Sequence, residues 1–133
     1  MKRTYKPALF LLAIMMIAIA SCKKDAASGK TLTLTVADSG KTLSVVNGEK
    51  ILVTLGNPGD GGFTFNAWQY NSSVLQLVGH TRNYPPANSP VGDFGSDTWQ
   101  FTAIQSGTST LKITATQSPV ETVTMFNGSI KVQ

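Results

Sequence analysis

Apolar and polar residues alternate along the chain beyond residue 30. The segment Thr31 to Val36 reads Thr-Leu-Thr-Leu-Thr-Val, and Ile51, Val53 and Leu55 repeat the same spacing of two. Successive side chains of a β-strand point to opposite faces, so this period predicts strands with one buried face. Apolar residues at helical spacing over three turns are not found after residue 30. The pattern therefore favours an all-β fold.

Further short segments have the same strand-like composition. They are residues 42–46, 74–78, 99–103, 111–115, 123–126 and 130–132. Asn47-Gly48 and Asn127-Gly128 are dipeptides typical of tight β-hairpins. About seven or eight short strands separated by turn residues predict an immunoglobulin-like antiparallel β-sandwich. Its predicted core consists of Ile51 or Leu52, Val53, Leu55, Leu75, Leu77, Trp99, Phe101, Leu111 and Ile113.

The N-terminal segment has a different pattern. Three basic residues, Lys2, Arg3 and Lys6, precede an unbroken apolar run from Ala8 to Ala20. This run is shorter than the roughly 20 residues that a helix needs to cross a bilayer, and charged residues follow it at once. A basic start followed by a short apolar run is typical of a secretory signal peptide rather than a transmembrane anchor.

The end of that segment carries a more specific motif. Ile19-Ala20-Ser21-Cys22 resembles the lipobox of bacterial lipoproteins. The resemblance implies that Cys22 is linked to diacylglycerol and becomes the first residue of the mature chain, held on a membrane by its acyl chains. We therefore expect a signal peptide at 1–21, a lipidated tether at 22–30 and a folded domain at 31–133. The expected location is the outer membrane or cell surface of a bacterial envelope.

Charge and cysteine content narrow the functional classes. The net charge of +4 comes largely from the N-terminal region. From residue 31 onward, five basic residues face six acidic ones without a basic stripe, so nucleic-acid binding has no support. Cys22 is the only cysteine, which leaves the predicted domain without a disulfide or a thiol nucleophile. We expect a monomer.

Residues for catalysis or metal binding are scarce. The only histidine, His80, follows a predicted strand, and no serine lies in a Gly-x-Ser-x-Gly elbow. Asp60, Asp93 and Asp97 lie in predicted glycine-containing loops, but none has the spacing of an EF-hand. Loop acids of this kind are typical turn residues. The sequence therefore predicts a binding module with no cofactor and no metal, and not an enzyme.

The glycine-rich loops carry a family resemblance. Asn57-Pro58 opens a loop that Gly62-Phe63-Thr64-Phe65 closes, and Val74-Leu75 follows Phe65 by nine positions. This order resembles the chagasin-type inhibitors of papain-like cysteine peptidases, whose first loop reads Asn-Pro-Thr-Thr-Gly-Tyr-x-Trp. The loop in this chain is one residue longer than that pattern. The resemblance extends over about residues 41 to 133.

Two further loops complete the resemblance. Gly92-Asp93-Phe94-Gly95 is similar to the second family motif, Gly-x-Gly-Gly, and leads into the Trp99-Gln100-Phe101 strand at the expected distance. The third family motif is Arg-Pro-Trp, whereas this chain has Ser118-Pro119-Val120. The proline is therefore kept, while the arginine and the tryptophan are absent.

The resemblance implies a mechanism based on occlusion. Three adjacent loops enter the cleft of a papain-like cysteine peptidase, and the first loop lies over the catalytic thiolate. Phe63 would be the hydrophobic tip of that loop, and Phe65 would anchor its base. The implied contact residues are Asn57, Pro58, Gly59, Asp60, Gly61, Gly62, Phe63, Gly92, Asp93, Phe94, Gly95, Ser118, Pro119 and Val120.

Two alternatives stay open at this point. One is a surface binding or adhesion module that has the same fold without inhibiting a peptidase. The other is a carbohydrate- or ligand-binding surface built on Trp68, Tyr70 and Tyr84, because exposed aromatic rings can stack on ligands.

Overall fold

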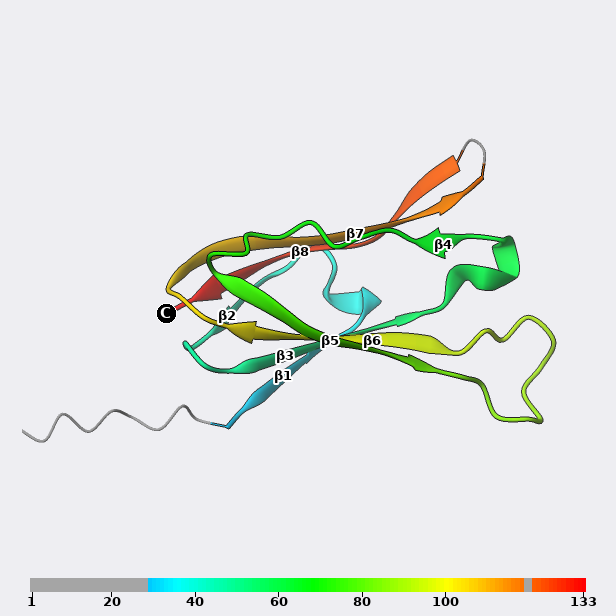
Figure 1. Cartoon of the computed structure of the whole chain (residues 1–133), viewed down its shortest axis with the longest axis horizontal. Coiled ribbons are helices and arrows are strands. Elements are labelled where there is room, and N and C mark those ends of the chain that lie inside the picture. Colours follow the sequence, from blue (N-terminus) through cyan, green and yellow to red (C-terminus); the bar gives the residue numbers. More distant parts are fainter. Residues whose placement is uncertain (1–28, 119–120) are drawn as a thin grey trace, which may run out of the picture.

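The computed structural model describes residues 29–118 and 121–133, which form two facing β-sheets (Figure 1). Two short 3₁₀ helices lie in the connections between strands. The elements are β1 (Thr31–Leu34), η1 (Val36–Asp38), β2 (Thr42–Val45), β3 (Lys50–Gly56), η2 (Pro58–Gly61), β4 (Thr64–Phe65), β5 (Leu75–Asn83), β6 (Ser96–Ala103), β7 (Gly107–Gln117) and β8 (Glu121–Val132). Among the described residues there is no helix of a length and hydropathy suited to crossing a membrane.

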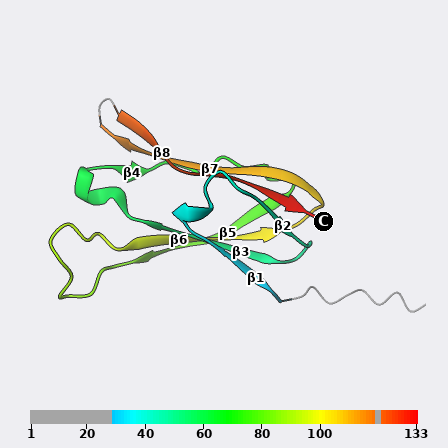
Figure 2. The ribbon, with the colours of Figure 1, turned by 180° about the vertical axis from the view of Figure 1, so that it is seen from behind.

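Each sheet has four strands. One has the order β1-β3-β6-β5 and the other β2-β8-β7-β4, and the views from both sides show them stacked face to face (Figure 2). The prediction of an all-β sandwich is confirmed. Two strand pairs, β1–β3 and β2–β8, are parallel, which the alternation pattern did not predict. The chain crosses to the opposite sheet between β1 and β2 and returns at β3, so these strands are not joined as hairpins.

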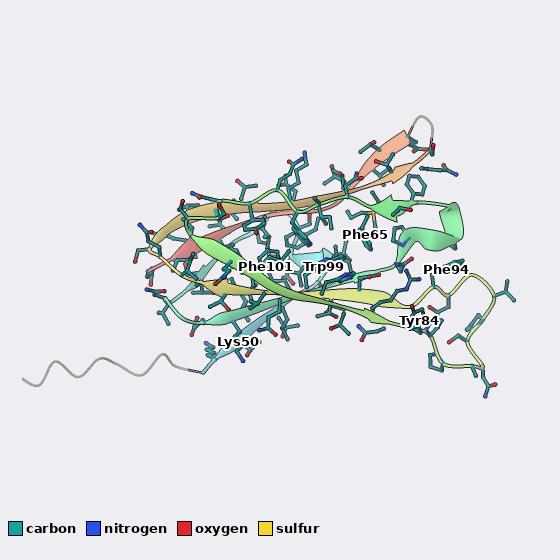
Figure 3. All side chains as sticks on the ribbon, viewed as in Figure 1. Lys50, Phe65, Tyr84, Phe94, Trp99 and Phe101 are labelled. Carbon is teal, nitrogen blue, oxygen red and sulfur yellow. The ribbon has the colours of Figure 1, made fainter. Side chains whose placement is uncertain are left out.

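The core lies between the sheets and is rich in aromatic rings. Trp99 and Phe101 of β6 point into it, and the rings of Trp68 and Tyr70 pack edge-on against them (Figure 3). The buried apolar residues are Leu34, Val45, Ile51, Val53, Leu55, Val74, Leu75, Trp99, Phe101, Ala103, Leu111, Ile113, Phe126, Ile130 and Val132.

Most of the predicted core is confirmed, with one error. Of the alternatives Ile51 and Leu52, Ile51 is fully buried and Leu52 lies partly exposed on the other face of β3. Leu77 was expected in the core, but 37% of it is exposed. It lies on β5, an edge strand, immediately before a register shift between Leu77 and Gly79. An irregular edge strand covers its side chains less well than a central strand does.

Both predicted Asn-Gly hairpins are wrong. Asn47-Gly48 does form a turn, but this turn joins β2 of one sheet to β3 of the other. Asn127-Gly128 lies inside β8, where Gly128 is paired with Leu111 of β7. A Cβ at Gly128 would lie 3.1 Å from the Phe126 ring and 3.4 Å from the Lys41 carbonyl oxygen. Gly128 therefore serves close packing and not chain reversal.

The bulge in β5 determines which side chains reach the end of the sandwich. After the shift, His80 is opposite Trp99 and Arg82 is opposite Asp97 of β6. Cross-strand partners share a face, so His80 and Arg82 lie on the same side of the sheet as Trp99. His80 was expected beyond a strand and Asp97 in a loop, but both lie within strands. A one-residue bulge reverses the facing of every later residue, and the alternation pattern does not reveal it.

Candidate functional site

The first two predicted loops lie at the same end of the sandwich as the end of β7 and the start of β8, opposite the C-terminus (Figure 1). A Cβ at Gly62 of the first loop would lie 3.4 Å from the Gln117 side chain at the end of β7. A Cβ at Gly92 of the second loop would lie 3.8 Å from the Asp60 carboxylate. Ser118 is exposed where β7 ends. The predicted site residues Pro119 and Val120, like the predicted lipidation site Cys22, lie outside the described residues.

The first loop is a single turn of 3₁₀ helix with defined ends. The Asn57 side chain accepts a hydrogen bond from the Gly59 amide at 2.9 Å, and Pro58 occupies the first helical position. Gly62 ends the turn with φ of 72°, and its amide donates to the Gly59 carbonyl at 3.0 Å. A left-handed residue at a helix end favours glycine. Asn57, Pro58 and Gly62 thus give this loop one preferred path.

Two phenylalanines follow the turn and differ in what they contact. Phe65 is paired with Ala115 of β7, and its ring meets Trp99 edge-on at 4.9 Å. The expectation that Phe65 anchors the base of the loop is therefore confirmed. Phe63 is half-buried, and its ring lies close to Gly61, where a Cβ would come within 3.0 Å of it. Gly61 therefore leaves room for the Phe63 ring beside the loop backbone.

The second loop, between β5 and β6, is held by its own hydrogen bonds. The Asp93 carboxylate accepts from the Gly95 amide at 2.8 Å, and the Asp93 amide donates to the Pro90 carbonyl at 3.1 Å. Gly92 and Gly95 both have positive φ, 95° and 75°. The Asn57 amide donates to the Gly95 carbonyl at 2.9 Å, which joins the first loop to the second.

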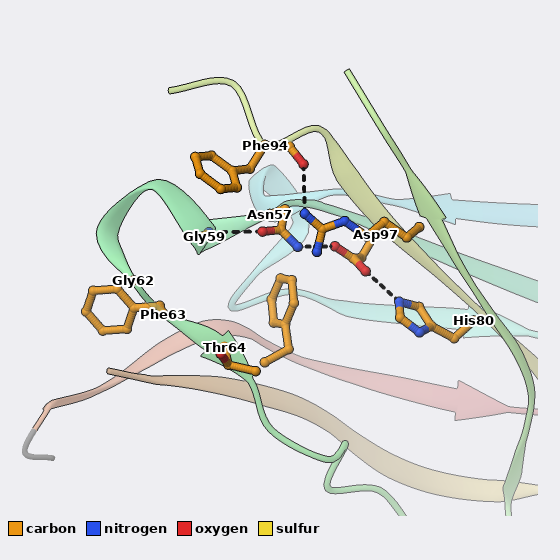
Figure 4. Close-up of a pocket in the computed structure, with 10 residues that line it drawn as sticks. Asn57, Gly59, Gly62, Phe63, Thr64, His80, Phe94 and Asp97 are labelled. Carbon is orange, nitrogen blue, oxygen red and sulfur yellow. Dashed lines mark hydrogen bonds and ion pairs between the residues drawn. The ribbon is translucent and has the colours of Figure 1, made fainter. Parts of the chain in front are cut away.

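A cleft of about 490 Å³ lies between these two loops and the end of the sandwich (Figure 4). The Phe94 ring, 41% exposed, packs over Gly59, where a Cβ would lie 2.7 Å from it. The cleft is lined by Asn57, Gly59, Gly62, Phe63, Thr64, Phe65, His80, Arg82, Phe94 and Asp97. The structure thus brings the first and second predicted loops together around one concave surface.

Three charged or ionisable residues of this cleft were not predicted as site residues. Asp97 is 2% exposed, and its two carboxylate oxygens accept from Asn57 Nδ2 and His80 Nε2, each at 2.6 Å (Figure 4). The His80 ring stacks on Trp99 at 4.8 Å with an interplanar angle of 7°. The Arg82 Nη2 donates to the Phe94 carbonyl at 3.3 Å. The spacing of two between His80 and Arg82 indicates that their side chains share one face of a strand, but the bulge between Leu77 and Gly79 that turns this face inward has no signal in the sequence.

Possible metal ligands do not cluster in the described part of the chain. Within residues 29–118 and 121–133, no three His, Cys, Asp or Glu side chains gather in a way that could hold a metal ion. Asp93 caps its own loop and Asp97 is bonded to Asn57 and His80.

The aromatic ligand surface is not formed by the residues expected to build it. Trp68 is partly buried, and its ring meets those of Trp99, Phe101 and Phe126 at 5.4–6.0 Å. Tyr70 packs against Phe101 at 5.3 Å. Both rings pack partly buried against the core, and the pocket that Tyr70 lines does not include Trp68 or Tyr84.

The chain is thus a β-sandwich whose first two predicted loops are joined at one end. The model of the Chagasin family peptidase inhibitor I42 matches residues 44–128. This match covers more than half of the chain, and the protein therefore belongs to the chagasin family of peptidase inhibitors. The members of this family are inhibitors, which fits the expectation of a non-enzyme. A search among curated proteins gave no match.

Two solved structures show the same fold. The cysteine protease inhibitor EhICP2 from Entamoeba histolytica superposes with a TM-score of 0.65 at 20% identity, over 77% of this chain and 96% of that chain. The solution structure of Amebosin gives a TM-score of 0.54 at 17% identity, over 79% of this chain and 100% of that chain.

Proposed function

We propose that this protein is a lipid-anchored inhibitor of papain-like cysteine peptidases that reversibly occludes the active-site cleft with three adjacent loops. The observation that carries the proposal is the contact between the loops at one end of the sandwich, within a chain of the chagasin family. A reversible plug needs a surface that enters a cleft without being cut. Loops held by their own hydrogen bonds suit this role, because they lose little conformational entropy on binding.

The composition of the first loop supports this role. Gly61 and Gly62 are exposed and carry no side chain where the loop would approach the catalytic thiolate. A glycine backbone can approach a crowded site that any larger side chain would block. Asn57 and Pro58 fix the path of the loop before binding, because the Asn57 side chain caps the turn that Pro58 begins.

The third loop is expected to limit the affinity. Ser118 and Val120 stand where the family motif has arginine and tryptophan, the residue types most enriched at interface hot spots. Loss of one such contact, at ~2 kcal/mol, weakens binding by roughly 30-fold. The same departure favours the second candidate function, a surface binding module that keeps the fold without inhibiting a peptidase.

The experiment measures papain activity at increasing concentrations of residues 23–133, which include every described residue. Reversible inhibition is the expected result. Full papain activity at saturating protein would contradict the inhibitor proposal for papain-like enzymes and favour the surface module.

A pair of variants separates loop contact from folding. Gly62→Asn adds a side chain at the loop, and Gly40→Asn adds the same side chain at another glycine of positive φ, with open space around it. Asparagine tolerates positive φ better than most residues. Only Gly62→Asn should weaken inhibition, by about tenfold or more for ~1.4 kcal/mol.

The lipid anchor is tested in the full chain. Cys22→Ser removes the acceptor thiol, so the protein should move from the membrane fraction to the soluble fraction and lose incorporation of labelled fatty acid. An unchanged distribution between the fractions would contradict the anchor.

A further inference from the structure

A buried carboxylate lies directly beneath the first loop. Asp97 of β6 is 2% exposed and is hydrogen-bonded to side chains from two other segments of the chain. A carboxylate only accepts hydrogen bonds, so Asn57 Nδ2 and His80 Nε2 both donate to it. An ionised group without partners is costly to bury, and these two short bonds offset that cost. Asp97 therefore depends on Asn57 and His80, and each of them is held by Asp97.

Asn57 connects Asp97 to both loops through hydrogen bonds. Its side-chain nitrogen donates to Asp97 and its side-chain oxygen accepts from the Gly59 amide at 2.9 Å, which closes the turn of the first loop. Its backbone amide donates to the Gly95 carbonyl at 2.9 Å, which holds the second loop. A rotation of the Asn57 side chain would therefore break the bond inside the first loop together with the bond to Asp97.

His80 fixes Asp97 from the edge of the sheet. Its ring lies flat on Trp99, so the direction of Nε2 is set by a buried side chain. The His80 side chain is 48% exposed and that of Asp97 is 4% exposed. Replacing His80 therefore leaves the core intact, whereas replacing Asp97 leaves buried donors without a partner. The bulge between Leu77 and Gly79 is what turns His80 toward Asp97.

We propose that His80 and Asp97 are positioning residues that hold Asn57, and through it the first loop, in the conformation that binds the peptidase. This inference rests on the proposed function, because it concerns the loop that would enter the peptidase cleft. Neither residue needs to touch the peptidase. Loss of the His80 bond lets the first loop sample other conformations, and binding then has to restore the bound one.

Two His80 variants separate the hydrogen bond from the ring stack. His80→Phe keeps an aromatic ring over Trp99 but has no donor for Asp97, whereas His80→Gln keeps a donor but no ring. A hydrogen bond to a charged group contributes enough free energy that its loss, if it frees the binding loop, lowers the affinity by about tenfold. His80→Phe should therefore weaken papain inhibition by about tenfold. His80→Gln should retain most of the inhibition, as a rescue by the conservative donor.

A buried acid at the other end serves as the matched control. Glu49 is 8% exposed and accepts a hydrogen bond from the Val46 amide at 3.0 Å. It lies in the turn between β2 and β3, at the end of the sandwich away from the loops (Figure 1). Glu49→Gln should lower the thermal midpoint without changing inhibition by the folded protein. Strong inhibition by His80→Phe combined with weak inhibition by His80→Gln would assign the effect to the stack and overturn the proposal.

A spectroscopic readout tests the same connection without a peptidase. Among the described residues, His80, Arg82 and Asp97 are the ionisable groups that line the cleft, and Asp60 and Asp93 lie on the loops above it. The side-chain amide protons of Asn57 should shift in NMR spectra between the natural sequence and His80→Phe, and should shift less in His80→Gln, which keeps a donor for Asp97.

The two experiments fail in different ways. If the natural sequence does not inhibit papain, the proposed function fails, while the Asn57 signals still report whether His80 is connected to the loop. If the natural sequence inhibits papain and His80→Phe inhibits equally well, the positioning role is wrong and the proposed function stands. The same holds if the NMR shifts of the Asn57 amide protons do not change when His80 is replaced.

Discussion

The two ends of the sandwich use a buried acid in different ways. At the end formed by the β2–β3 turn, Glu49 accepts from the Val46 amide, three residues earlier in the chain. At the loop end, Asp97 accepts from Asn57 and His80, which are 40 and 17 residues away. The first acid closes a local turn, while the second joins a loop, a central strand and an edge strand.

This difference shows which parts of the molecule the fold itself requires. The β2–β3 turn is short and is closed by a backbone bond from the Glu49 amide to the Val46 carbonyl at 3.1 Å. The sheets need no more than this to reverse direction. The loop end carries two long loops, several glycines of positive φ and a buried polar network beyond what connecting strands would demand. Ordered loops on a rigid scaffold are where binding residues concentrate.

The largest expected effect is a loss of stability on replacing Trp99, which packs beneath the loop end. Trp99 is 5% exposed and its ring contacts those of Phe65, Trp68 and His80. Trp99→Ala should reduce the free energy of unfolding by about 3–5 kcal/mol, measured by urea denaturation, because it leaves a cavity and removes three ring contacts. Ile104→Ala replaces a residue that is 41% exposed and should stay within about 0.5 kcal/mol. Equal losses in the two variants would contradict this picture of the core.

An intermediate effect tests the joint between the loops. Gly95 has φ of 75°, and a Cβ there would clash with the Asn83 carbonyl oxygen. Gly95→Ala should destabilise the protein by about 1–2 kcal/mol through backbone strain and by a further ~1–3 kcal/mol through the clash. Gly40→Ala, at φ of 83° with open space around it, should show the strain alone. The difference between their thermal midpoints measures the clash. Equal midpoints would show that the backbone of the second loop shifts at no cost in stability.

The smallest effect concerns an acid that is not buried. Backbone hydrogen bonding from Thr35 lowers the pKa of the Asp38 carboxyl, and Lys41 lowers it further. Because the folded-state pKa is depressed, this stabilisation is present above the ordinary value of 3.8 and is lost as the pH falls through the folded-state value. The natural sequence should lose slightly in thermal midpoint as the pH falls from about 5 to 3, and Asp38→Asn should not show this loss. An identical pH dependence in both proteins would contradict this role for Asp38.

The alternation of residues was sufficient to predict the class of fold and most of the core. Ile51, Val53 and Leu55 lie on one face of β3 as their spacing required. The glycines and the proline of the first loop also indicated its place and its turn, because positive φ and a fixed φ are properties of single residues. The domain boundaries and the contact residues in the three loops stay predictions.

The sequence by itself determined what depends on a residue and its near neighbours: where most strands lie, which of their faces are apolar and how the first loop turns. Only the tertiary structure decided which sheet each strand joins, that Asn127-Gly128 continues a strand, and that His80 faces Asp97. These features depend on pairing between residues far apart in the chain and on a single bulge in β5. Long-range pairing has no period along the sequence, and one inserted residue reverses every later side chain.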